Sequence, residues 1–185
     1  MELSRGNLKL GNDTLILNMN SATNCPAKFL GLCKLPHKCY ALKAEKQYKA
    51  VLPYRERQHV AWDKESAADI VAGILLDQKR YKNTIKYLRF SEAGDFMNQA
   101  DVDKMSEIAQ LLEPHGVRVY GYTARRDLCF IEVHRNMVVN GSGFMVHNSF
   151  TAESRPAGKL VCPGNCRTCQ MCKYNRGISI EVKEH

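Results

Sequence analysis

The sequence has no long apolar run. No stretch approaches the roughly 18 consecutive apolar residues that a membrane-spanning helix needs, so we expect no contact with a membrane. The first residues, 1–5, lead into no apolar segment, and we therefore expect no cleaved signal peptide. A cytoplasmic location follows as an expectation, and in that compartment thiols stay reduced.

Several familiar catalytic signatures are also missing. There is no Ser–His–Asp order, no glycine-rich phosphate loop and no dinucleotide-binding fingerprint. Internal repeats and low-complexity tracts are absent as well. These absences exclude the commonest hydrolase and nucleotide-binding patterns, and they leave the catalytic residues and the substrate unassigned.

Charge and composition are those of a globular protein with a basic excess. The 185 residues are 44% hydrophobic and 25% charged, with a formal net charge of +8. Part of the excess lies within residues 38–57, at Lys43, Lys46, Lys49, Arg55 and Arg57. Such a balance permits nucleic acid as a partner, although helical spacing of these residues equally fits a solvated face.

Alternating strand-like and helix-like segments predict an α/β fold. Strands are expected at residues 13–19, 84–90, 117–122 and 137–140, and helices at 66–80 and 99–113, with a shorter helix at 125–134. About four βα units favour a partial, open parallel barrel, or a small doubly wound sheet. We expect this barrel to span residues 1–150, with a cysteine loop at 20–39. A linker at 149–158 would lead into a cysteine-rich tail, residues 151–185, packed on the barrel and ending in an edge strand at 178–182.

Seven of the eight cysteines fall in two groups, which are the strongest signal in the chain. The tail carries Cys162, Cys166, Cys169 and Cys172 in the pattern C-x3-C-x2-C-x2-C. Structural zinc sites usually separate two cysteine pairs by a dozen or more residues, whereas 4Fe–4S clusters accept closely spaced ligands such as C-x2-C-x2-C-x3-C-P. The tail therefore predicts a 4Fe–4S cluster, with zinc as the alternative.

The second group, Cys25, Cys33 and Cys39, follows the first expected strand with the spacing C-x7-C-x5-C. Three thiols would leave one iron of a cubane open to a substrate or cofactor. These thiols either form a second site or join the tail thiols around one shared cluster. His37 lies between two of them and is expected to be a solvated loop residue.

The position of this trio and its ending, Cys39-Tyr40-Ala41, resemble the cluster loop of radical S-adenosylmethionine proteins. The closest likeness is to small radical-SAM-like proteins of phages and mobile elements. Residues 89–96, at the end of the second expected strand, resemble the turn of that family that contacts the cofactor. The resemblance implies a candidate radical SAM-like enzyme with S-adenosylmethionine as a cofactor, bound by Glu92, Gly94 and Asp95. A phage-encoded copy would work in the host cytoplasm.

Other interpretations of the same residues stay open. The protein could be a non-catalytic module in which zinc or an iron–sulfur cluster joins two loops. Such a module could bind nucleic acid. Asp95 could cap the following helix instead of binding a cofactor. Cys129 is expected to be a small buried hydrophobe, and Trp62 with Tyr40, Tyr48 and Tyr54 to be core residues. Arg125 and Arg126 are expected to be a solvated pair, with the binding of a phosphate or carboxylate as the alternative.

Overall fold

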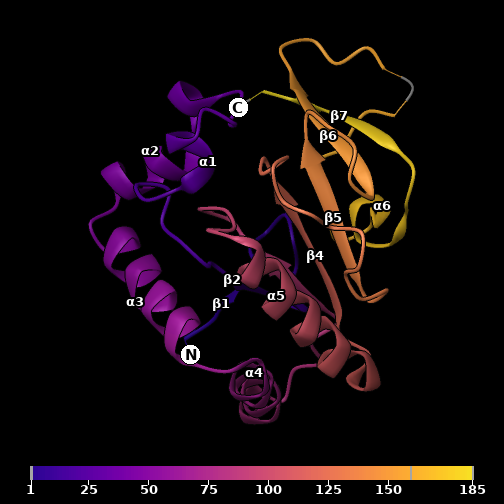
Figure 1. Ribbon diagram of the computed structural model, residues 1–185. Coiled ribbons are helices and arrows are strands. Elements are labelled where there is room, and N and C mark those ends of the chain that lie inside the picture. The colour runs from indigo at the N-terminus through magenta and orange to yellow at the C-terminus, as the bar shows by residue number, and fades with distance from the viewer. Residues whose placement is uncertain (1, 159, 185) are drawn as a thin grey trace.

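One seven-stranded sheet organises the chain. The computed structural model describes residues 2–158 and 160–184 (Figure 1). Its strands follow sequence order across the sheet, and only the first pairing, between β1 and β2, is antiparallel. They are β1 (Ser4–Arg5), β2 (Thr14–Leu17), β3 (Tyr87–Phe90), β4 (Arg118–Thr123), β5 (Met137–Ser142), β6 (Asn148–Glu153) and β7 (Ser179–Lys183). In the described residues β1 and β7 form the two edges, so the sheet is mixed, mostly parallel and not closed.

Most of the helices come between β2 and β4 in the sequence. The chain forms α1 (Pro26–Phe29), α2 (Tyr40–Gln47), α3 (Val51–Lys64), α4 (Ala67–Tyr81), α5 (Gln99–Leu112) and, in the tail, α6 (Met171–Tyr174). Short 3-10 turns cover Pro36–Lys38 and Glu113–His115. The expected helices at 66–80 and 99–113 are confirmed. The first of them begins with a capping box, in which the Ser66 hydroxyl accepts a hydrogen bond from the Asp69 amide.

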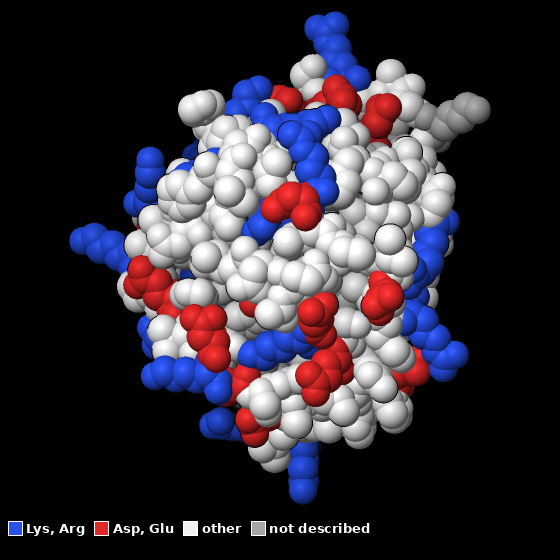
Figure 2. Space-filling view, in the orientation of Figure 1, with Lys and Arg blue, Asp and Glu red and all other residues white. Residues whose placement is uncertain are grey.

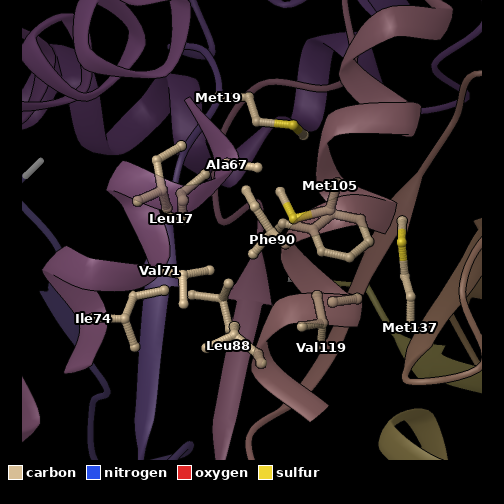
Figure 3. Close-up of a cluster of buried hydrophobic side chains, with 14 of the residues drawn as sticks. Leu17, Met19, Ala67, Val71, Ile74, Leu88, Phe90, Met105, Val119 and Met137 are labelled. Carbon is tan, nitrogen blue, oxygen red and sulfur yellow. The ribbon is translucent and has the colours of Figure 1, made fainter. Parts of the chain in front are cut away.

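The main core lies between the sheet and the pair α4–α5. Leu15, Leu88, Val119 and Met137 are register neighbours on four adjacent strands and are all fully buried. Figure 3 shows Leu88 and Val119 of the sheet in one cluster with Val71 of α4 and Met105 of α5. The α5 face consists of Val102, Met105, Ile108, Ala109 and Leu112. Leu111, by contrast, is 37% exposed.

Gly121 in β4 allows β3 and β4 to approach closely. Gly121 is the register partner of Phe90, and a Cβ atom there would collide with the Phe90 carbonyl oxygen and stand 2.5 Å from the Phe90 ring. Gly73 in α4 has open space around its Cα.

We therefore expect opposite effects from two glycine-to-alanine substitutions. Gly121→Ala should lower the free energy of unfolding by at least about 1–3 kcal/mol, because both the β3 backbone at Phe90 and the Phe90 ring must shift to admit the Cβ atom. Gly73→Ala should raise it by about 0.5–1 kcal/mol, since alanine favours helix and meets nothing. Urea unfolding followed by circular dichroism measures both. A neutral Gly121→Ala would show that β3 and β4 are not in this register.

Two segments differ from the expectation. Residues 125–134 form turns instead of a helix, because the Arg125 guanidinium is buried and donates to the carbonyls of Phe96 and Met97. Arg125 is thus a clamp on the β3–α5 connection and not a solvated residue. The expected linker at 149–158 contains most of β6. Because β6 pairs with β5 on one side and β7 on the other, the sheet continues without interruption through residues 150 and 151. The edge strand expected at 178–182 is confirmed as β7.

No helix in the described ranges is both long and apolar enough to cross a membrane.

Candidate metal centre

The sheet face opposite α4 and α5 forms one wall of a cavity of about 470 Å3. Side chains alternate along a strand, so residues two apart share a face. The lining of this cavity includes Arg89 of β3 and Ser91 directly after it, Tyr120 and Tyr122 of β4, Phe150 and Ala152 of β6, and Ile180 and Val182 of β7. The same alternation sends Leu88 and Phe90 of β3 into the core on the other side.

All four tail thiols, those of Cys162, Cys166, Cys169 and Cys172, also line the cavity. Backbone hydrogen bonds fix the tail against the sheet and the N-terminal segment. The Cys162 amide donates to the Glu181 carbonyl at 2.7 Å, and the Cys166 amide donates to the Lys9 carbonyl at 3.1 Å. The Asn140 side chain of β5 donates to the Cys172 carbonyl at 3.0 Å.

Lys173 adds an internal clamp to the tail. It is only 2% exposed, and its ammonium donates to the Cys166 carbonyl at 2.9 Å while lying 3.7 Å from the centre of the Tyr87 ring. Burial lowers the pKa of Lys173. The tail loop is therefore held in place by the protein itself.

Two of the three N-terminal thiols, Cys33 and Cys39, line the same cavity, whereas Cys25 is not among its lining residues. Cys25 lies at the N-cap position of α1. The three thiols nevertheless lie near one another. The negative charge of the Cys33 thiolate raises the pKa of Cys25, and that of the Cys39 thiolate raises the pKa of Cys33. The structure thus brings six cysteines from both ends of the chain to one cavity.

A buried ion pair holds the start of the cysteine loop. The Glu45 carboxylate accepts from the amides of Ala22 and Thr23 at 2.7 and 2.9 Å. It also lies 2.8 Å from the Arg55 guanidinium, which donates to the Ala41 carbonyl at 3.0 Å. Helices α2 and α3 are therefore joined to the loop by charge-assisted hydrogen bonds.

The cysteine loop and the end of the described chain are neighbours. The Lys38 ammonium lies 2.7 Å from the Glu184 carboxylate. Figure 1 shows the C-terminal end beside the segment that carries α1 and α2. This closeness explains how two groups more than a hundred residues apart in sequence share a cavity.

Burial raises the pKa of several of these thiols. It is the main cause of the rise of Cys25 and Cys172 to about 11 and of smaller rises at Cys33 and Cys166. Lys9, Arg89 and Lys173 oppose the rise at Cys166, and a hydrogen bond with Tyr122 opposes it at Cys172. Because a thiol must lose its proton to bind a metal, a bound cation would reverse the effect of burial. Within residues 2–158 and 160–184, no three Cys, His, Asp or Glu side chains are arranged to hold a single metal ion.

The three residues expected to bind a cofactor occupy different surroundings. Glu92 lines the cavity, and its carboxylate lies 3.8 Å from Arg55. Gly94 and Asp95 are not in the lining. Gly94 has a φ of +74° and packs against Asn20, where a Cβ atom would collide.

Asp95 joins the ends of β3 and β4. Its carboxylate accepts from the Thr123 hydroxyl at 2.7 Å and from the amides of Ala124 and Phe96 at 2.8 and 2.9 Å. Burial raises its pKa to about 6. Asp95 does not cap α5, since that position belongs to Asn98, whose side chain accepts from the Asp101 amide.

Several single-residue expectations are now decided. Trp62 is a core residue and His37 is exposed, both as expected. Cys129 is exposed, because the turns at 125–134 leave it on the surface. Tyr40 and Tyr48 are each about half exposed and are therefore not core residues. Tyr40 lines the cavity, and its hydroxyl donates to the Glu92 carbonyl at 2.8 Å.

Sequence reasoning missed the polar residues on the cavity wall. Arg89, Tyr120 and Tyr122 alternate with core residues along β3 and β4, and this alternation was the available signal. The expected basic partner surface has no counterpart on the face shown in Figure 2, where Lys and Arg are scattered among Asp and Glu.

Comparison with known proteins gives one match. A family model described as Gene product 88 matches residues 1–152. The matched range includes Cys25, Cys33 and Cys39 and ends before the four tail thiols. Neither the curated proteins nor the solved structures contain a match.

Proposed function

We propose that this chain, which belongs to the gene product 88 family, is an iron–sulfur protein that holds a 4Fe–4S cluster between its N-terminal cysteine loop and its C-terminal tail. The observation that carries the proposal is the convergence of six cysteines on one cavity. The family's numbered gene-product name agrees with a phage type of protein. The proposal places the protein in the cytoplasm, where thiols stay reduced and available as ligands.

The donor set fits such a group. Thiolates are soft ligands that select iron–sulfur clusters, zinc and copper(I). Four of them come from one short tail loop whose backbone is already fixed by hydrogen bonds to Lys9, Glu181 and Asn140. The positive charges of Lys9 and Lys173 act on Cys166 and would offset the negative charge of a thiolate-ligated cluster.

Cys33 and Cys39 decide between two arrangements. They either complete one shared cluster with tail thiols or, with Cys25, hold a second cluster that has an open iron. In the second arrangement the chain would be a radical SAM-like enzyme within a partial barrel, and Glu92 is the residue of the expected trio placed to meet S-adenosylmethionine. When bound, that cofactor would supply radical chemistry. Gly94 and Asp95 would shape the turn that positions Glu92.

Anaerobic purification tests the proposal. We expect a brown protein that absorbs at about 400 nm. It should contain about four iron atoms and four acid-labile sulfide ions per cluster. A colourless protein that contains zinc would overturn the cluster and favour the zinc-stapled module. Adding S-adenosylmethionine to the reduced protein then separates the two arrangements, because only the enzyme would release 5′-deoxyadenosine.

A further inference from the structure

The Arg89 side chain lines the cavity, and one nitrogen of its guanidinium lacks a hydrogen-bond partner among the described residues. This nitrogen, Nε, is buried. The carboxylate of Glu92 is paired with Arg55 at 3.8 Å, and none of the ion pairs within residues 2–158 and 160–184 includes Arg89. The guanidinium instead lies 5.4 Å from the centre of the Tyr122 ring. Buried polar groups without partners are rare in proteins and call for an explanation.

Tyr120 presents a second such group beside it. Tyr120 is the register partner of Arg89 on the adjacent strand, and it is 2% exposed. Its hydroxyl is buried and, in the part of the chain that the structure describes, unpaired. Both residues line the cavity. Two neighbouring strands thus direct unused hydrogen-bond donors into the same space.

The chemistry of these donors selects an oxyanion. A guanidinium presents its N–H groups in a planar fork that matches a carboxylate or a phosphate, whereas a thiolate sulfur offers no such pair of acceptors. Farther along the same sheet face the lining is apolar, with Phe150 of β6 and Ile180 and Val182 of β7. The cavity of about 470 Å3 is within the size range of small-molecule sites.

We propose that Arg89 and Tyr120 form the binding site for the carboxylate or phosphate head of a small organic acid, whose apolar body packs against Phe150, Ile180 and Val182. This site goes beyond the proposed cluster, because it depends on side chains other than the thiols. The bound acid would lie beside the tail cysteines and would be positioned for any chemistry that occurs there.

Calorimetric titration of the full-length, anaerobically purified protein tests this site. Benzoate and phenyl phosphate serve as anionic probes, and benzyl alcohol serves as their neutral analogue. We expect at least one anion to bind and the alcohol to bind at least about tenfold more weakly, because a hydrogen bond to a charged group is lost. Arg89→Gln should weaken the anion by about tenfold or more, and Tyr120→Phe by a few fold.

Arg126→Gln is the matched control, since it removes the same charge from an exposed arginine outside the cavity. It should leave affinity unchanged, and Arg89→Lys should restore part of it. Arg89→Gln should fold with an undiminished melting temperature, because the Arg89 side chain makes no hydrogen bond within residues 2–158 and 160–184. Failure of both anions to bind, or equal affinity for the alcohol, would overturn the site. So would an Arg89→Gln variant that loses iron but binds the anion as before, since Arg89 would then serve the cluster. The iron and sulfide content of the same protein tests the proposed cluster independently of anion binding.

Discussion

Replacing Cys172 with serine should reduce the iron and sulfide content to less than about a tenth of the wild-type value. The Cys172 thiol lines the cavity, it is hydrogen-bonded to Tyr122, and its carbonyl is fixed by Asn140. Serine keeps the size of the side chain but is a poor ligand for soft metals. Loss of a tightly bound group also removes its stabilisation of the folded state, so the melting temperature of the anaerobic protein should fall as well. Cys166→Ser should behave in the same way.

Cys129→Ser is the matched control for this loss. Cys129 is the cysteine outside both groups, and it is exposed on the turns that follow β4. Its replacement should leave the metal content and the melting temperature unchanged. Equal metal content in the Cys172→Ser and Cys129→Ser proteins would refute a cluster ligated by the tail.

The N-terminal thiols separate one cluster from two. If Cys39→Ser removes all of the iron, the loop and the tail share one cluster. If it removes about half, two clusters are present, and the one that remains belongs to the tail. The iron count per chain, measured by elemental analysis, distinguishes these outcomes.

Removing Arg55 should destabilise the protein by about 3–5 kcal/mol, the largest effect on folding that we expect from a single polar residue. The Arg55 and Glu45 side chains are 5% and 1% exposed and lie 2.8 Å apart. Arg55→Met would leave the Glu45 carboxylate buried without its cation, and breaking a buried pair in this way costs far more than the pair itself contributes. Guanidinium unfolding monitored by circular dichroism measures the change.

An exposed ion pair formed by another arginine of α3 provides the comparison. Arg57 lies 3.3 Å from Glu2, and both side chains are about 60% exposed. Arg57→Met should therefore change the free energy of unfolding by less than about 1 kcal/mol. Because Glu45 also binds the amides of Ala22 and Thr23, Arg55→Met should reduce the metal content contributed by the cysteine loop. Similar stability losses in the two variants would contradict the buried pair.

The sequence by itself determined the alternation of strands and helices. Ile70, Ile74, Val102 and Met105 recur at helical spacing, and apolar strand residues such as Leu15 and Leu88 are separated by polar turns, so local periodicity was sufficient. Where packing replaced periodicity, the prediction was wrong. Residues 125–134 looked helical, yet burial of Arg125 against the carbonyls of Phe96 and Met97 imposed turns.

The two cysteine groups were likewise visible in the sequence, as sets of thiols with stated spacing. Their convergence was not, because only tertiary structure places Cys33 and Cys39 beside Cys166 and Cys172. Spacing along the chain fixes which thiols of one loop can meet, since a few residues span only a short distance. Residues more than a hundred positions apart meet only in the tertiary structure, here around one cavity and beside the ion pair between Lys38 and Glu184. The same physical reason hid the unpaired Arg89 and Tyr120, whose surroundings are set by strands that pair in space.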